Sequence, residues 1–117
     1  MKVIIAGGRN ITDYNIVKTA YVKSGFMATE IVSGGARGAD YLGEVLANNI
    51  SISIKRFPAD WNKYGKRAGP LRNLQMAEYA DALVAVWDGE SKGTANMIMQ
   101  ARQHGLDVFV YLTKENP

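Results

Sequence analysis

Short apolar runs alternate along the chain with longer stretches in which apolar residues recur every three or four positions. The short runs predict five strands, Lys2–Ala6, Glu30–Ser33, Ile52–Phe57, Ala82–Trp87 and Asp107–Leu112. The longer stretches predict four helices between them, Asp13–Lys23, Tyr41–Asn49, Pro70–Tyr79 and Thr94–His104. Strands that alternate with helices are typical of a parallel sheet that is covered on both faces and joined by right-handed crossovers. We therefore expect an α/β fold with a single domain over residues 1–117.

The same pattern predicts which strands are central in the sheet and which face of the last helix packs against it. Ala82–Trp87 is the most apolar strand and is expected to be central, whereas the alternation in Ile52–Phe57 is typical of a strand nearer an edge. The packing face predicted for Thr94–His104 consists of Ala95, Ile98, Met99 and Ala101. Pro58–Gly69 is expected to be irregular, and Thr113–Pro117 is expected to fray.

Composition narrows the classes of site. The chain has 117 residues, 47% of them apolar, with no cysteine and one histidine, which excludes disulfides, thiolate metal sites and histidine-rich metal sites. We predict neither a metal nor a cofactor. The apolar start of the chain is too short for a signal peptide or a membrane span, so we expect a cytoplasmic protein without a membrane partner. A net charge of +3 and a pI near 9.2 favour anionic ligands without demonstrating nucleic-acid binding.

Glycine and basic residues gather in the segments that lead from a strand to the next helix. Nine of the twelve glycines fall there: Gly7, Gly8, Gly34, Gly35, Gly38, Gly65, Gly69, Gly89 and Gly93. Six of the fourteen basic residues lie in or beside the same segments: Arg9, Arg37, Lys66, Arg67, Arg72 and Lys92. In a parallel sheet these segments share the edge at the carboxyl ends of the strands, where open α/β sheets bind ligands. The sequence therefore predicts an anion site at this edge.

Ser33–Asp40 is the clearest candidate within that edge. A strand, a glycine turn that carries Arg37 and a helix start aim backbone N–H groups and a positive helix end at an anion. The segment is not a dinucleotide fingerprint, because Ser33 stands where G-x-G-x-x-G has its first glycine and the third strand ends at Lys55–Phe57 without an acid. No P-loop sequence is present, and although Gly89–Gly93 matches G-x-S-x-G, the one histidine, His104, is expected at the far end of the following helix and leaves a serine nucleophile without a base. Hydride transfer and serine hydrolysis are therefore disfavoured.

Four motifs together carry a family resemblance. Ser33–Asp40 resembles the S-G-x-A-R-G-x-D segment of the DNA-processing protein Smf/DprA, and Gly69–Asn73 resembles the arginine-bearing helix start that this protein shares with LOG proteins. Asp81–Gly89, followed by Gly93 and Thr94, is similar to the strand and turn of LOG proteins and nucleoside 2-deoxyribosyltransferases. With Gly7–Arg9 and Phe57–Trp61 included, nearly the whole chain resembles the small YspA/cpYpsA-related branch of the SLOG superfamily.

The resemblance implies a single Rossmann-like three-layer domain, a five-stranded parallel sheet in the order 3-2-1-4-5, and a site for a nucleotide or nucleotide-derived ligand. The crevice would lie between the first and fourth strands, flanked by Gly7–Arg9 and Asp88–Thr94. Relatives of this type often form homodimers, which implies a dimer here. The expected ligand-binding residues are Gly7, Gly8, Arg9, Ser33, Gly34, Gly35, Arg37, Gly38, Asp40, Arg72, Asn73, Asp88, Gly93 and Thr94, with Trp61 and Tyr64 as candidates for base stacking.

Several of these residues also have simpler explanations. Asp40 is suited to capping the start of its helix or to placing a negative charge there. Thr94 is suited either to binding a phosphate or to capping its helix. Arg72 stands just inside a predicted helix start, where its charge is unfavourable, so we expect an anion to compensate it. Trp61 and Tyr64 are equally suited to covering the core or to a subunit contact.

At one position the sequence differs from the related families in a way that bears on whether a nucleotide is only bound or also cleaved. LOG proteins and deoxyribosyltransferases carry a glutamate three positions after the threonine of G-T-x-x-E, whereas this chain has Met97 there. A methionine can neither transfer a proton nor attack an anomeric carbon. The nearest carboxylates are Asp88, Glu90, Asp60 and Asp40.

We therefore predict a domain that senses or sequesters a phosphorylated nucleotide. Two alternatives stay open. The first is an N-glycosidic hydrolase acting on nucleotides, so whether the chain is an enzyme is undecided. The second is a protein that binds single-stranded nucleic acid, with Lys63, Lys66 and Arg67 as its basic track.

Overall fold

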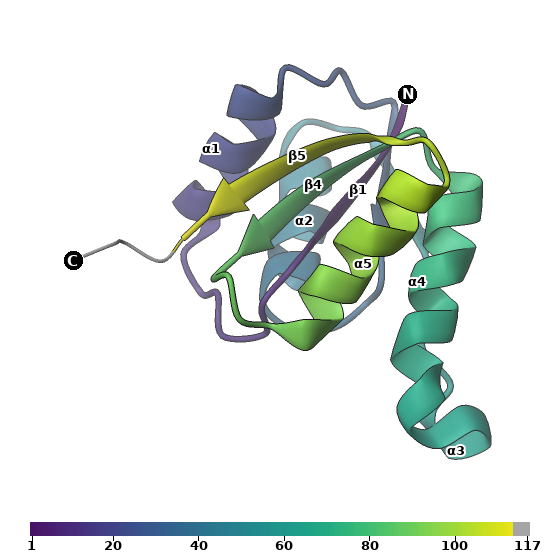
Figure 1. Ribbon diagram of the computed structural model, residues 1–117. Coiled ribbons are helices and arrows are strands. Elements are labelled where there is room, and N and C mark those ends of the chain that lie inside the picture. The colour runs from purple at the N-terminus through teal and green to yellow at the C-terminus, as the bar shows by residue number, and fades with distance from the viewer. Residues whose placement is uncertain (114–117) are drawn as a thin grey trace.

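Residues 1–113 of the chain are described by a computed structural model (Figure 1). Five strands form one parallel sheet in the order β3-β2-β1-β4-β5, which confirms the predicted α/β fold and strand order. The strands are β1 Lys2–Gly7, β2 Glu30–Ser33, β3 Ser53–Arg56, β4 Ala82–Trp87 and β5 Asp107–Leu112. Thr113, expected to begin a frayed end, donates its backbone N–H to the carbonyl oxygen of Trp87 at 2.8 Å, and the rest of that end lies outside the described residues.

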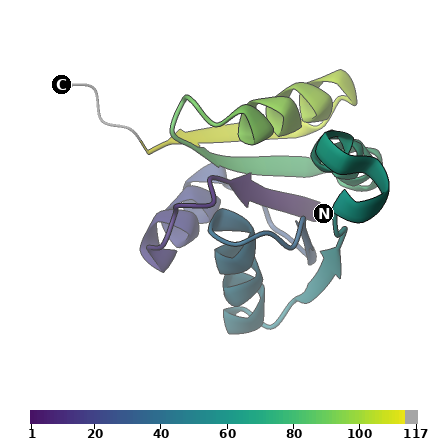
Figure 2. The ribbon, with the colours of Figure 1, turned by 90° about the horizontal axis from the view of Figure 1, so that it is seen from below.

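Helices cover both faces of this sheet. They are α1 Tyr14–Ser24, α2 Ala39–Asn49, α3 Trp61–Tyr64, the 3₁₀ turn η1 Gly65–Arg67, α4 Ala68–Tyr79 and α5 Lys92–Gln103. Figure 2 shows α1 and α2 on one face and α5 on the other, where α4 also packs, so the domain has three layers. The start of α1 follows from Asp13, whose side chain accepts a hydrogen bond from the backbone N–H of Asn15 at 2.9 Å.

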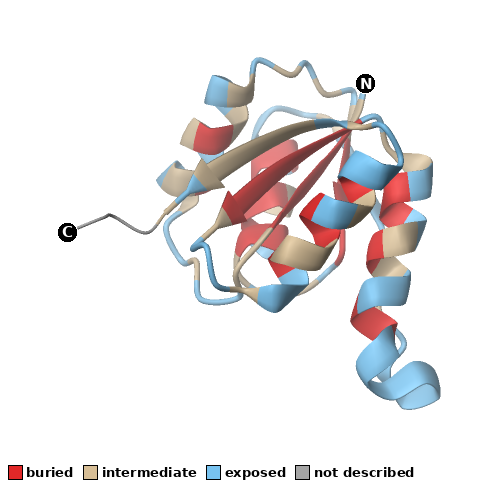
Figure 3. Cartoon of the chain, in the orientation of Figure 1, coloured by how far each residue is buried: buried red, intermediate tan, exposed pale blue. Residues whose placement is uncertain are grey.

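The longest buried runs of residues lie in β1 and β4, in the interior of the sheet (Figure 3). Successive side chains of β1 point to opposite faces, so Ile5 packs with α1 and α2 whereas Ile4 packs with α4 and α5. Because both faces are covered, these strands are apolar throughout instead of alternating. Each fully buried aliphatic side chain stabilises the fold by about 1.5–3 kcal/mol. This packing fixes the strand ends from which the loops of the carboxyl edge emerge.

Two local predictions are wrong. Pro58–Gly69, expected to be irregular, contains α3, η1 and the first residues of α4. Asp60 caps α3 by accepting a hydrogen bond from the backbone N–H of Lys63 at 3.1 Å, and Pro70 fits the first turn of α4, where its missing N–H has no helical partner. On α5, Met99 is 46% exposed instead of packed, because the buried face is formed by Thr94, Met97, Ile98 and Ala101.

The loops that follow β1 and β2 meet at the carboxyl edge, and the contact requires glycine. The backbone N–H of Ala39 donates to the carbonyl oxygen of Gly8 at 3.1 Å. Gly38 has a φ of +80°, and a Cβ on it would lie 2.3 Å from that same oxygen. A Cβ on Gly7 would lie 2.2 Å from the carbonyl oxygen of Val86 and 2.8 Å from the Cβ of Ala39. The strands β1 and β4 and the start of α2 therefore converge on Gly7 without room for a side chain.

Gly7→Ala is expected to lower the free energy of unfolding by about 3 kcal/mol, because the added methyl group would meet atoms that the sheet and α2 hold in place. Gly93→Ala is the matched control, since a Cβ at Gly93 would meet nothing within 4 Å. The control should change stability by at most about 1 kcal/mol. Urea denaturation followed by circular dichroism measures both, and equal effects would contradict the close approach at Gly7.

Candidate functional site

A cavity of 820 Å³ opens at the carboxyl edge, between the ends of β1 and β4. Its walls come from the loop after β1, from the start of α2, from α4 and from the turn that begins α5. It therefore lies at the switch point of the sheet, where open α/β folds bind ligands. Ten of the sixteen residues predicted to bind or stack on the ligand line it: Gly7, Gly8, Arg9, Asp40, Trp61, Arg72, Asn73, Asp88, Gly93 and Thr94.

A second cavity of 360 Å³ adjoins the first and has a different character. Arg9, Ala36, Trp61 and Arg72 line both cavities, so the two spaces share a wall. The other residues of the smaller cavity are Gly34, Gly35, Arg37, Pro58 and Ala59. Three arginines therefore border a small space whose described lining contains no carboxylate.

Arg72 and Asn73 tie the two sides of the site together. Arg72 Nη1 donates to the carbonyl oxygen of Gly34 at 2.6 Å, and its Nε donates to Asn73 Oδ1 at 3.1 Å. Asn73 Nδ2 donates in turn to the carbonyl oxygen of Gly93 at 3.3 Å and to Asn96 Oδ1 at 3.0 Å. The loop after β2 is thereby joined through α4 to the start of α5.

The location expected for Arg72 is wrong in one respect. Helix α4 begins at Ala68, not at Pro70, so Arg72 lies beyond the first turn of the helix instead of at its positive end. Burial lowers the pKa of its guanidinium, as does the nearby charge of Arg9, whereas the Asp40 carboxylate raises it. Part of the compensation that the sequence predicted from a ligand therefore comes from the protein itself.

Asp40 is 6% exposed and lines the larger cavity. Its Oδ2 accepts a hydrogen bond from the backbone N–H of Ala36 at 3.3 Å, whereas its Oδ1 accepts none from residues 1–113. Burial raises the pKa of this carboxyl from 3.8 to about 6. Glu44 adds to the rise, while Arg72 and Arg9 oppose it. A group that changes charge near neutral pH thus stands among the arginines.

Ser33 supports the glycine turn from beneath and lines neither cavity. Its hydroxyl is fully buried, donates to Glu44 Oε2 at 2.7 Å and accepts from the backbone N–H of Gly35 at 3.0 Å. Glu44 also pairs with Arg56 at 2.7 Å. Although burial acts to raise the pKa of Glu44, the hydrogen bonds from Arg56 and Ser33 outweigh it and lower the pKa.

The two candidate stacking residues lie in different places. Trp61 borders both cavities, its ring is partly exposed, and the guanidinium of Arg9 lies 5.8 Å from its centroid. Tyr64 lines neither cavity and has the ammonium of Lys63 5.1 Å from its ring. Gly38 also lines neither cavity, since it contacts the loop after β1.

The carboxylates nearest to the missing glutamate differ in their surroundings. Met97 is buried and forms part of the larger cavity. Asp60 caps α3, and Asp88 Oδ1 accepts hydrogen bonds from the backbone N–H groups of Glu90 and Ser91, both at 2.8 Å. Of the four carboxylates named from the sequence, only Asp40 is buried.

The structure also adds residues to the site. Asn96 lines the larger cavity beside Asn73, and Ser91 caps α5 by accepting a hydrogen bond from the backbone N–H of Thr94. Pro58 and Ala59 line the smaller cavity. Pro58 and Ala59 belong to the Phe57–Trp61 motif, and this motif could have identified them as site residues. No pattern in the sequence identified Asn96.

This fold and site define a Rossmann-like α/β domain with an arginine-lined site at its switch point. The chain belongs to the YspA, cpYpsA-related SLOG family, whose model matches residues 1–64. The Gene 61 protein of Mycobacterium phage D29 is 36% identical to it over an alignment of 85 residues, and the match covers 68% of this chain and 68% of that protein. The predicted family is therefore confirmed.

Among solved structures, the DNA processing protein A (DprA) of Streptococcus pneumoniae has a similar fold, with a TM-score of 0.73 and 17% sequence identity. The comparison covers 93% of this chain and 49% of the DprA chain, so this chain spans about half the length of DprA.

Among residues 1–113, no helix has the length and apolar character that crossing a membrane requires. The same residues contain no group of three or more potential metal-binding side chains.

Asp40→Asn is expected to raise the free energy of unfolding at pH 7.5 by about 1–3 kcal/mol, because a raised carboxyl pKa means that the folded state disfavours the charge. In the wild type this penalty grows as the pH rises from about 4 to about 6, and it is absent below the unfolded-state pKa. The gain from the substitution should therefore vanish near pH 4. Urea denaturation at both pH values measures the difference. Destabilisation at pH 7.5 would show instead that Arg72 requires the charge.

Proposed function

We propose that this domain binds a phosphorylated nucleotide across the two cavities and thereby senses or sequesters it. The phosphates would occupy the smaller cavity and the nucleoside the larger one. The observation that carries the proposal is the convergence of Arg9, Arg37 and Arg72 on a space lined by no carboxylate among the described residues. Like charges in one place repel one another, and a bound anion relieves this repulsion. Membership of the SLOG family and the likeness to a DNA-processing protein support a nucleotide or nucleic-acid ligand.

The glycine turn supplies the remainder of the phosphate environment. Gly35 has a φ of +73°, and a Cβ there would meet no atom within 4 Å, so a ligand can approach the backbone closely. The turn leads into the eleven-residue helix α2, whose positive end favours an anion. A charge-assisted hydrogen bond from an arginine contributes about 1.5–3 kcal/mol. Three such groups contribute about 4.5–9 kcal/mol before the cost of immobilising the ligand, which leaves weak binding for phosphate alone and gives contacts to the nucleoside a necessary part.

The larger cavity suits a nucleoside. Its volume of 820 Å³ lies within the range of small-molecule sites, roughly 300–1,000 Å³. Its lining offers a carboxyl group, an amide and a hydroxyl from Asp40, Asn96 and Thr94. Trp61 stands where the two cavities meet, so its ring is placed to stack on a base. Stacking of a base on an aromatic side chain contributes about 1–3 kcal/mol.

The charges around the site favour binding over cleavage. Cleavage of a glycosidic bond proceeds through a transition state with positive charge on the sugar. Among residues 1–113, Asp40 is the one buried carboxyl that lines the larger cavity, and the positive charges of Arg72 and Arg9 act on it and would oppose a positive charge on the sugar. Met97, which replaces the glutamate of related glycosidases, offers neither a proton nor a nucleophile.

Arg37→Ala is expected to weaken nucleotide binding by about 10- to 100-fold, the equivalent of one charge-assisted hydrogen bond. Arg37 is exposed and pairs with no carboxylate among residues 1–113, so the fold should be unaffected. Arg102→Ala, in the last turn of α5 and outside both cavities, is the matched control. Thermal-shift screening of nucleoside mono-, di- and triphosphates, followed by calorimetry, tests the proposal. The proposal fails if no nucleotide raises the melting temperature of the wild type.

Trp61→Ala should weaken nucleotide binding by about 5- to 100-fold, since a stacked base loses about 1–3 kcal/mol. Binding of inorganic pyrophosphate, which has no base, should be unchanged. Trp61→Phe retains an aromatic face and should recover most of the affinity. Calorimetric titration of the three proteins with both ligands makes the comparison. An equal loss for nucleotide and pyrophosphate would assign Trp61 to the phosphate site instead.

A further inference from the structure

Residues Trp61–Arg67, here called the basic arm, form the most exposed segment of the carboxyl edge. All seven are exposed, in α3 and η1. Figure 1 shows α3 at the end of α4 that projects beyond the sheet, and Figure 3 shows this end as exposed surface. The core does not require these side chains, because none of them is buried.

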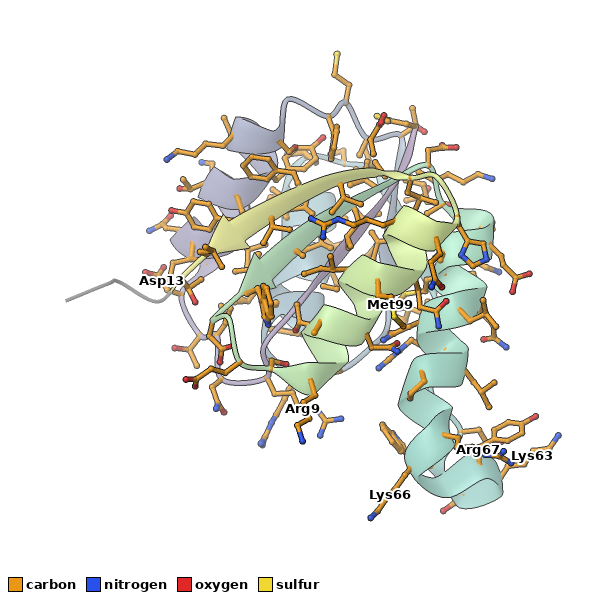
Figure 4. All side chains as sticks on the ribbon, in the orientation of Figure 1. Arg9, Asp13, Lys63, Lys66, Arg67 and Met99 are labelled. Atoms are coloured by element: carbon orange, nitrogen blue, oxygen red, sulfur yellow. The ribbon has the colours of Figure 1, made fainter. Side chains whose placement is uncertain are left out.

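The arm carries three positive charges that pair with no carboxylate among residues 1–113. Figure 4 shows Lys63, Lys66 and Arg67 around the projecting end of α4, away from the sheet. No carboxylate of the described chain lies within 4.0 Å of any of them; the one ion pair between described side chains joins Arg56 to Glu44. Asp60, the acid nearest in sequence, uses its Oδ1 to cap α3. The charges are therefore available to an external polyanion.

Two aromatic side chains alternate with these charges. Trp61 is 49% exposed and Tyr64 is 40% exposed, so both side chains leave aromatic surface open to solvent beside the cations of Arg9 and Lys63. Cations that interleave with exposed aromatic rings are the arrangement that holds single-stranded nucleic acid, because unpaired bases stack on the rings while phosphates meet the cations. A duplex presents no unstacked bases for such rings.

The arm is continuous with the nucleotide site. Trp61, its first residue, lines both cavities, and the guanidinium of Arg9, which also lines both, lies 5.8 Å from the centroid of its ring. A chain that leaves the cavities past Trp61 therefore meets the basic arm next.

We propose that the site receives the phosphorylated terminal nucleotide of a single-stranded nucleic acid, with the following nucleotides lying on the basic arm. This inference rests on the proposed function, since the terminal nucleotide occupies the two cavities. It names a strand end, instead of a free nucleotide, as the preferred ligand.

The test compares thymidine 5′-monophosphate with a short 5′-phosphorylated oligothymidylate by calorimetry and fluorescence anisotropy. The oligonucleotide should bind more tightly. Three phosphate contacts on the arm predict that its additional affinity falls by about 20-fold between 50 and 200 mM salt. Lys63→Glu/Lys66→Glu/Arg67→Glu should abolish this advantage while leaving the mononucleotide affinity unchanged. The matched control is Lys18→Glu/Lys23→Glu/Arg102→Glu, which changes the net charge equally at exposed positions outside the arm and both cavities.

Each outcome separates the two proposals. If the mononucleotide binds and the oligonucleotide binds no more tightly, the strand-end inference is wrong while the proposed function stands. If neither ligand binds, the proposed function fails as well. Equal losses in the arm variant and its control would show a general charge effect and overturn the inference. A further outcome is an oligonucleotide affinity that is unchanged both by removal of the 5′-phosphate and by Arg37→Ala. The strand would then lie on the arm without its end in the cavities, and this result would also overturn the strand-end inference.

Discussion

Two adjacent polar side chains within α4 hold the carboxyl edge in its observed shape. Arg72 bonds to the carbonyl oxygen of Gly34 on one side of the switch point, and Asn73 bonds to that of Gly93 on the other. The hydrogen bond between Arg72 and Asn73 makes one connected path from the loop after β2 to the start of α5. A hydrogen bond with a charged donor contributes about 1.5–3 kcal/mol, and an unsatisfied buried acceptor costs about as much. The shape of both cavities therefore depends on the position of α4 against the two loops.

This seating has an electrostatic consequence. Burial of Arg72 and Asp40 disfavours both charged forms, lowering the pKa of the guanidinium and raising that of the carboxyl. The two groups influence each other, yet they do not approach to within 4.0 Å. Arg9 adds a further positive charge to the same place. Among the described residues no carboxylate lines the smaller cavity to neutralise these charges, and of its three arginines Arg72 is the one partly withdrawn from solvent, where screening is weaker. A site preorganised in this way favours an anion without having to rearrange.

The fold could be predicted from the sequence because the patterns that determine it are local. Apolar runs that alternate with helical periods specify a parallel sheet, and a parallel sheet gathers the strand-to-helix loops at one edge. The strand order came from family resemblance alone. The division of that edge into two cavities could not be predicted, since it depends on where α4 begins and on contacts between distant residues. Ser33 illustrates the limit: its hydroxyl serves Glu44, one helix away, although its place in the glycine turn suggested a ligand contact.

The glycines that drew attention to this edge are there for two different reasons. At Gly34 a Cβ would lie 2.4 Å from Arg72 Nη1 and 2.7 Å from Asp40 Oδ2, so this glycine makes room for the buried charged groups. Gly7 and Gly38 likewise permit the close approach of neighbouring backbone. At Gly35 the surrounding space is open, and the glycine instead leaves the backbone accessible. A glycine-rich turn therefore does not mark a ligand at every position. In this chain Gly34 makes room for Arg72, Gly38 lets the loop after β1 approach, and Gly35 leaves its backbone open beside the arginines that line the smaller cavity.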